Sequence, residues 1–202
     1  MKESHKQKTR RQLQAERTKD RLFEAAITLL AEKDFEQITI RDIVSGADVS
    51  IGTFYKYYST KMEVFYETYR IADQYFEETV APTLTQPTAQ ERILAFFDAY
   101  ALYSSVLTDM KMTKLLYNPN NTFFNRDMNC GMLAALISAI QYGLGLGELT
   151  GGDTAEEMAN FFMISVRGLV YNWCTTYGAY DLKAATRKFV LRLLRGYLSD
   201  PK

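Results

Sequence analysis

The chain has 202 residues, 47% of them hydrophobic, which is enough to bury a sizeable core in one or two domains. Its longest apolar stretch, residues 132–140, is far too short to cross a bilayer, and the first residues carry no apolar secretion signal. We therefore expect a cytoplasmic protein with no membrane partner.

The formal net charge is zero, but the charges are unevenly distributed along the chain. Residues 1–61 hold twelve Lys and Arg against nine Asp and Glu, whereas the remainder has an acidic excess. The basic excess is concentrated in the first 21 residues, which contain eight basic and three acidic side chains. We expect residues 1–17 to form a basic, flexible arm, whose charges are either solvated or available to neutralise phosphates.

The N-terminal third of the chain shows the helical spacing of apolar residues, beginning with a first amphipathic helix over residues 18–33. Thr39 and Asp42 form a capping pair for a short second helix, and Ser50 can cap a third helix only a few residues later. Two short helices across a tight turn are typical of a helix-turn-helix. We therefore predict a three-helix DNA-binding domain at residues 18–62.

Residues 63–202 continue with helical periodicity and form a second, larger domain, so the predicted fold class is all-α. No alternating strand pattern or hairpin signal is present in the sequence. Helices are predicted at residues 61–80, from residue 88 to about 103, and at 110–116, 123–143, 154–177 and 182–198.

The second helix of a helix-turn-helix enters the major groove with its N-terminal end toward the bases. Here that end consists of Ser50, Ile51, Gly52 and Thr53. Gly52 has no side chain to hold the backbone away from DNA, Thr53 can donate a hydrogen bond, and Ile51 can contact a thymine methyl group. Tyr55 is placed to donate to a phosphate, and Lys61 at the start of the next helix adds positive charge.

The segment from Ile38 to Phe65, ITIRDIVSGADVSIGTFYKYYSTKMEVF, resembles the DNA-binding signature of the tetracycline-repressor (TetR) family of bacterial transcriptional regulators. The matching features are a Thr-x-x-x-Ile cap, an Ala-x-Val-Ser turn, Gly-Thr-x-Tyr, an aromatic residue at Tyr58 and a Lys that opens the next helix. The resemblance implies dimeric binding to a double-stranded operator. It also implies that residues 63–202 form a ligand-binding and dimerisation domain, with the last two helices at the dimer interface.

The resemblance places DNA contacts at ten positions, which are Thr39, Arg41, Ser50, Ile51, Gly52, Thr53, Tyr55, Lys56, Tyr57 and Lys61. Arg41 is the strongest candidate for reading a base, because a guanidinium can pair with guanine through two hydrogen bonds. The alternative is that Arg41 forms a surface ion pair with Asp42 or Glu36.

Two further groups of residues are candidates for binding surfaces in the second domain, one for a dimer interface and one for a ligand pocket. An apolar stripe on the last helix predicts a dimer interface made by Phe189, Val190, Leu193, Leu194 and Tyr197, unless the stripe packs only within its own subunit. Central aromatic residues predict a pocket lined by Tyr100, Tyr103, Tyr117, Phe124, Phe162 and Trp173, unless they are ordinary core. Such a pocket would favour an apolar or aromatic ligand.

These features predict a ligand-responsive homodimeric regulator, more specifically a repressor that binds a palindromic operator and is released by a small, largely apolar or aromatic molecule. The single histidine, His5, leaves no histidine for a catalytic triad or a metal site in the helical part. We therefore expect no enzyme activity, no metal and no cofactor. A different class of protein remains open, namely an enzyme or carrier that binds a small molecule and has structural N-terminal helices.

Overall fold

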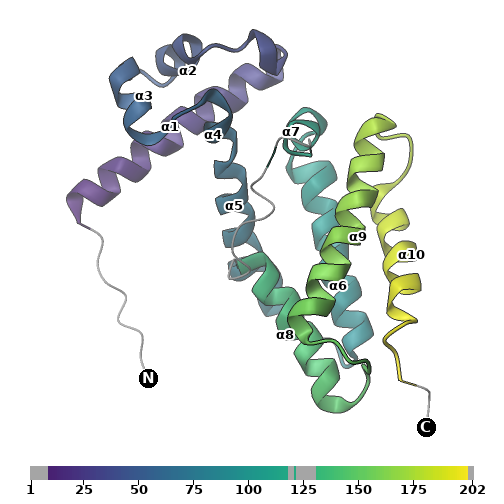
Figure 1. Ribbon diagram of the computed structural model, residues 1–202. Coiled ribbons are helices and arrows are strands. Elements are labelled where there is room, and N and C mark those ends of the chain that lie inside the picture. The colour runs from purple at the N-terminus through teal and green to yellow at the C-terminus, as the bar shows by residue number, and fades with distance from the viewer. Residues whose placement is uncertain (1–8, 118–120, 122–130, 200–202) are drawn as a thin grey trace. The chain divides into compact units, whose positions relative to one another are not determined.

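The computed structural model describes residues 9–117, 121 and 131–199 (Figure 1). Within this part the chain is helical, and its β pairing is limited to one isolated bridge between Leu149 and Leu198. The all-α prediction is confirmed. The chain divides into two compact units, residues 1–67 and 68–202.

The first unit is a small helical domain. Its elements are α1 (Arg10–Glu32), the 3-10 turn η1 (Phe35–Gln37), α2 (Ile40–Gly46), α3 (Ile51–Tyr57) and α4 (Lys61–Phe65). Helix α1 packs against α2 and α4, and α2 packs against α3 (Figure 1). The fully buried side chains of Leu22, Ile43, Phe54 and Phe65 form the core.

Helix α1 begins at Arg10, eight residues before the predicted start, so residues 10–17 are helical rather than flexible. Thr9 and Gln12 form a capping box at this end, and most of the residues that follow are good helix formers. The apolar spacing could not indicate this part of the helix, because α1 buries no side chain before Leu22.

The second unit is a larger helical bundle. It follows Glu67, the first residue of α5 (Glu67–Tyr75), and contains the π turn η2 (Phe76–Val80), the 3-10 turn η3 (Ala81–Thr83), α6 (Ala89–Leu102), the π turn η4 (Tyr103–Leu107), α7 (Met110–Leu116), α8 (Gly131–Leu146), α9 (Ala155–Thr175) and α10 (Leu182–Leu194). The long helix predicted over residues 61–80 is therefore three pieces, α4, α5 and η2.

The bundle is held together by α6 and α9, each of which packs against both α8 and α10 (Figure 1). Phe96, Phe97 and Phe162 are fully buried between these helices. Gly143 lets α8 pass close to α6, because a Cβ at this position would collide with the Cβ of Ala89. No described helix is long and apolar enough to span a membrane.

Candidate nucleic-acid interface

Helix α3 is capped and anchored so that its N-terminal end is presented outward. The Ser50 hydroxyl accepts a hydrogen bond from the Thr53 amide at 3.0 Å, and the two side-chain oxygens lie 2.9 Å apart. On the inner side, the Phe54 ring is fully buried and holds the helix to the domain. On the outer side, Ile51 and Tyr55 keep 42% and 57% of their surface exposed, which is a large fraction for residues of this type.

Packing within the protein does not require a glycine at position 52. A Cβ built at this position would approach only the Ser50 hydroxyl oxygen, at an ordinary contact distance of 3.7 Å. Glycine inside a helix costs stability relative to alanine, by about 1 kcal/mol. The glycine therefore weakens α3 without relieving any internal clash, which is the pattern expected where an external partner must come close to the backbone.

The start of α2 is ordered by a capping box and an ion pair that leave Arg41 exposed. The Asp42 carboxylate accepts from the Thr39 amide at 2.8 Å and pairs with Lys33 at 2.9 Å. The hydrogen bond from Lys33, followed by those from Thr39, lowers the pKa of Asp42 to about 2. Within the described residues Arg41 forms no ion pair, so the alternative pairing with Asp42 or Glu36 is not seen.

Lys61, which was predicted to add positive charge at the DNA, also makes contacts within the unit. Its Nζ donates to the carbonyl oxygens of Phe35, at 2.6 Å, and Ile38, at 2.7 Å, and lies 4.0 Å from the centre of the Phe35 ring. Partial burial lowers the pKa of this ammonium group. Lys61 thus ties the start of α4 to the segment before α2, and only one of its three donor directions remains for another partner.

A buried carboxylate organises the opposite side of the same unit. Glu67 is 8% exposed, and its Oε1 accepts from the Tyr58 hydroxyl at 2.9 Å and from the Lys19 ammonium at 3.2 Å. Tyr58 ends α3, Lys19 belongs to α1, and Glu67 is the first residue of α5. The carboxylate therefore joins three helices, and no sequence motif indicated this role.

The remaining predicted contacts lie on the outer side of α3 or beside it. Tyr55 and Lys56 are exposed, Thr53 and Tyr57 are half-buried, and the Lys56 ammonium lies 5.4 Å from the centre of the Tyr57 ring. Ser50, Ile51 and Gly52 are exposed, as is Thr39 at the start of α2. Apart from Lys61, the candidate DNA contacts are thus gathered around the ends of two short helices.

Comparison with known proteins agrees with this geometry. Residues 22–68, which include the whole helix-turn-helix, match the family model of bacterial regulatory proteins of the tetR family. This segment is similar to the DNA-binding part of TetR-family regulators. The chain is also 22% identical over 180 residues to the fatty acid metabolism regulator protein of Bacillus subtilis (strain 168), covering 87% of this chain and 93% of that protein.

Two solved structures show that the similarity in fold extends over the second unit. The FadR regulator of Bacillus subtilis in complex with stearoyl-CoA has a TM-score of 0.68 at 20% identity, over 88% of this chain and 98% of that one. FadR of Thermus thermophilus in complex with lauroyl-CoA has a TM-score of 0.70 at 22% identity, over 91% and 97%. At this level of identity the comparison establishes the fold.

The aromatic residues predicted to line a pocket lie mainly in the core of the second unit. Phe162 is fully buried, and Tyr100 and Trp173 are nearly so. Tyr103 and Tyr117 are half-buried, and the hydroxyl groups of Tyr100 and Tyr117 are hydrogen-bonded to each other. Phe124 lies outside the described residues. These positions form one aromatic region, in which burial strongly raises the pKa of Tyr117.

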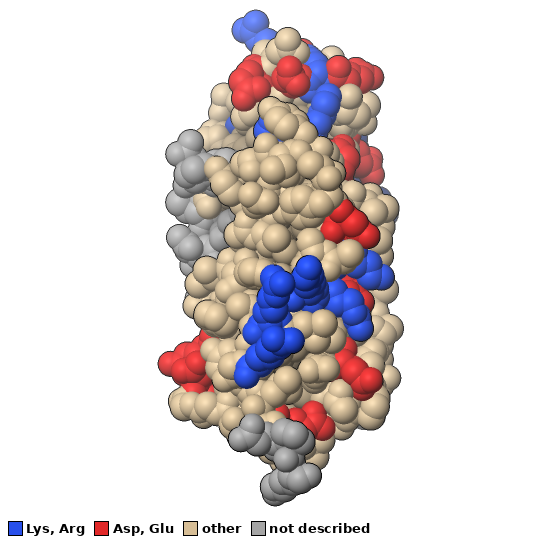
Figure 2. Space-filling view, turned by 90° about the vertical axis from the view of Figure 1, so that its right-hand side faces the viewer, with Lys and Arg blue, Asp and Glu red and all other residues tan. Residues whose placement is uncertain are grey.

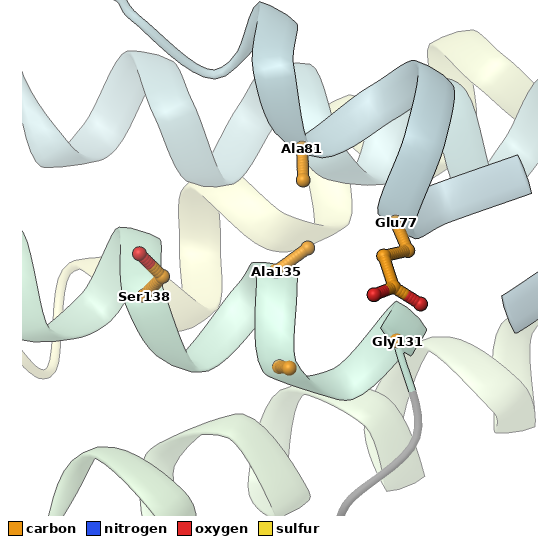
Figure 3. A pocket seen from close by; sticks show the side chains of 6 residues that line it. Glu77, Ala81, Gly131, Ala135 and Ser138 are labelled. Carbon is orange, nitrogen blue, oxygen red and sulfur yellow. The ribbon is translucent and has the colours of Figure 1, made fainter. Parts of the chain in front are cut away.

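A groove elsewhere on the second unit lies between η2, η3 and the start of α8 (Figure 3). Its walls are formed by Glu77, Ala81, Gly131, Ala134, Ala135 and Ser138. Gly131 is required by close packing, because a Cβ there would lie 2.7 Å from the Asp73 carbonyl oxygen. The walls include none of the aromatic residues that the sequence indicated, so this groove was not predicted.

The stripe predicted as a dimer interface divides between core and surface. Val190 and Leu194 are fully buried within the protomer, and Phe189, Leu193 and Tyr197 are half-buried. A different stripe is exposed on α9, where Phe161, Ile164 and Tyr171 keep 44%, 60% and 47% of their surface accessible. The sequence could have indicated this stripe, because α9 has apolar residues on two sides and only one side can face the protomer's own core.

The face of α10 carries a group of basic side chains, with acidic side chains along one side of it (Figure 2). The exposed basic residues of this helix are Lys183, Arg187, Lys188 and Arg192. Arg187 pairs with Asp98 of α6 at 2.8 Å. This pair helps to fix α10 on the bundle, although partial exposure limits its contribution to stability.

The contacts of Lys61 predict a role in stability. Replacing Lys61 with Met keeps an apolar stem of similar size but removes both hydrogen bonds to the carbonyl groups, so the free energy of unfolding should fall by about 1–3 kcal/mol. The matched control is Lys56→Met, which removes an exposed ammonium and should change the stability by less than about 0.5 kcal/mol. Urea denaturation followed by circular dichroism measures both, and equal stability of the two variants would contradict the assignment.

Proposed function

We propose that this protein is a homodimeric transcriptional repressor that acts in the cytoplasm, binds a palindromic operator and is released by a small molecule. The observation that carries the proposal is the outward N-terminal end of α3, with Ile51, Gly52 and Tyr55 exposed on a buried anchor, inside the segment that matches the TetR family. A dimer that covers two half-sites represses by occupying the promoter. The relatives are regulators, and we propose no catalytic role.

In the proposed complex, base reading and phosphate binding are carried by different residues. Arg41 reads a base, because its guanidinium is exposed and pairs with no acidic side chain of the described chain. Ser50, Thr53 and Thr39 are occupied as helix caps, but a hydroxyl that accepts a hydrogen bond still has its own proton to donate. Tyr55, Tyr57 and Lys56 contact the phosphates, and the third donor of Lys61 adds to them.

The proposed dimer uses the exposed stripe of α9 together with α10. Phe161, Ile164, Gly168 and Tyr171 follow one another at spacings of three and four residues, so they share one face of the helix. A Cβ at Gly168 would meet nothing within 4 Å, so this glycine leaves room for a partner helix to approach closely. An exposed apolar stripe of this kind is typical of a surface that a second protein covers.

The proposed effector binds in the aromatic region of the second unit and is largely apolar or aromatic. Tyr100, Tyr103 and Tyr117 supply hydroxyl groups within apolar surroundings, which is the composition of many small-molecule sites. The two FadR relatives were solved with stearoyl-CoA and lauroyl-CoA, whose acyl chains have this chemistry. Lauroyl-CoA is therefore the first probe to use.

The DNA role of Gly52 predicts opposite effects on stability and binding. Gly52→Ala should stabilise the fold by about 0.5–1 kcal/mol through helix propensity, yet weaken promoter binding about tenfold because the methyl group lies between backbone and groove. Gly145→Ala in α8, where a Cβ also meets nothing, should give the same stabilisation with unchanged DNA binding. Fluorescence anisotropy with promoter DNA tests this. Wild-type affinity of the Gly52→Ala variant would show that the backbone at Gly52 does not approach the DNA closely.

The dimer face predicts the effect of a charge on α9. Ile164→Glu should yield a monomer that binds the operator poorly, because a dimer must place two recognition helices about 34 Å apart, or at a multiple of that distance. Val106→Glu is the control, since Val106 is 67% exposed, against 60% for Ile164, and lies on η4. Sedimentation velocity gives the oligomeric state. A dimeric Ile164→Glu variant would show that α9 is not the interface.

The proposed release predicts a reciprocal effect between effector and operator. If lauroyl-CoA lowers operator affinity by a coupling of about 1–3 kcal/mol, operator DNA must lower the affinity for lauroyl-CoA by the same factor. Calorimetric titrations of the protein alone and of the protein saturated with operator compare the two affinities at one salt concentration. Equal affinities would mean that this ligand does not operate the switch, however tightly it binds.

A further inference from the structure

The N-terminal half of α1 extends beyond the body of its unit. Residues 10–21 include no buried side chain, although they form a regular helix with a capping box at Thr9. At 1.5 Å per residue this part is about 18 Å long. Lys19 and Arg21 contact the rest of the unit, but the exposed side chains before them are available to another partner.

The side of α1 that meets the helix-turn-helix can be followed from its contacts. A Cβ at Gly46, the last residue of α2, would lie 3.2 Å from the Cβ of Ala25. One turn earlier, the Arg21 guanidinium donates to the carbonyl oxygens of Ala47 and Asp48, the second at 2.8 Å. This side of α1 therefore faces the turn between α2 and α3.

Three more arginines continue this side of the helix toward the N-terminus. Counting back from Ala25 and Arg21 in steps of three and four residues leads through Thr18 and Gln14 to Arg11. Arg10 and Arg17 lie one turn before Gln14 and Arg21, on the same side. We call Arg10, Arg11 and Arg17 the α1 ridge.

The ridge differs in charge from the rest of the helix. Lys19 points to the opposite side and pairs with the buried Glu67, so its charge is neutralised within the unit. The three ridge arginines are exposed, and within the described residues they form no ion pair. Three free guanidinium groups on one side of a rigid helix form a concentrated positive surface, which fits a polyanion.

The length of the ridge fits the DNA backbone. Residues 10–17 span about 10 Å along the helix, and one DNA strand carries a phosphate every 3.4 Å or so along its axis. About three phosphates of one strand therefore lie within reach of three arginines. Because a guanidinium donates in a planar fork, each can hold one phosphate through two hydrogen bonds.

We propose that the α1 ridge binds the phosphate backbone next to the half-site that α3 reads. This surface lies outside the family match, which begins at residue 22, and it rests on the proposed function as a DNA-binding protein. The contact is independent of base sequence, so it lengthens the footprint and increases the salt dependence of binding to any duplex.

The test is the salt dependence of DNA binding by the full-length protein. The variant Arg10→Gln, Arg11→Gln, Arg17→Gln is compared with wild type by fluorescence anisotropy between 50 and 300 mM salt, on the promoter duplex and on a random-sequence duplex. Each lost phosphate contact lowers the slope of log affinity against log salt by about 0.9, and a bound dimer carries six ridge arginines, so the slope should fall by roughly 5 on both duplexes. Replacing the same residues with Lys should restore most of the slope.

A matched control removes three charges from the second unit, by Lys111→Gln, Lys114→Gln and Lys183→Gln, and should leave the slope unchanged. If wild type binds DNA and the ridge variant keeps the wild-type slope, the ridge is not a DNA contact while the proposed function stands. If wild type binds neither duplex, the proposed function and this inference both fail. The ridge buries nothing, so circular dichroism should show all variants folded.

Discussion

The buried carboxylate of Glu67 is the interaction on which the DNA-binding unit depends. A buried acid without donors is strongly unfavourable, so the hydrogen bonds from Tyr58 and Lys19 to this oxygen stabilise the unit. Those two donors come from the end of α3 and from the middle of α1. One carboxylate at the first residue of α5 therefore links the end of the recognition helix to the longest helix of the unit.

The short helices of this unit need stabilising side-chain contacts of this kind. Helices α2, α3 and α4 have seven, seven and five residues, which is too few for stability in isolation. Thr39, Ser50 and Thr60 satisfy the free amides at their N-termini, and Lys61 satisfies carbonyl groups before α2. Thr39 and Ser50, which cap two of these helices, are also proposed DNA contacts, so recognition and local stability are not separable at these two positions.

The sequence was informative wherever the physical cause is local. The capping pair of Thr39 and Asp42 and the cap at Ser50 could be predicted, because spacing within one turn determines them. The role of Lys61 could not, because its carbonyl partners lie 26 and 23 residues earlier in the chain. Val190 was assigned to a dimer interface because an apolar stripe does not reveal which part of it the chain's own helices cover.

The unsupported half of α1 also has a consequence for folding. An isolated helix of this length is marginal in water, because forming its first turn fixes several residues for a single hydrogen bond. Here that nucleus is supplied by the other half of α1, which Leu22, Ala26 and Leu30 hold in the core. Adding turns to an existing helix requires only propagation. The exposed half is therefore ordered by its continuity with the buried half, and the capping box at Thr9 satisfies its free end.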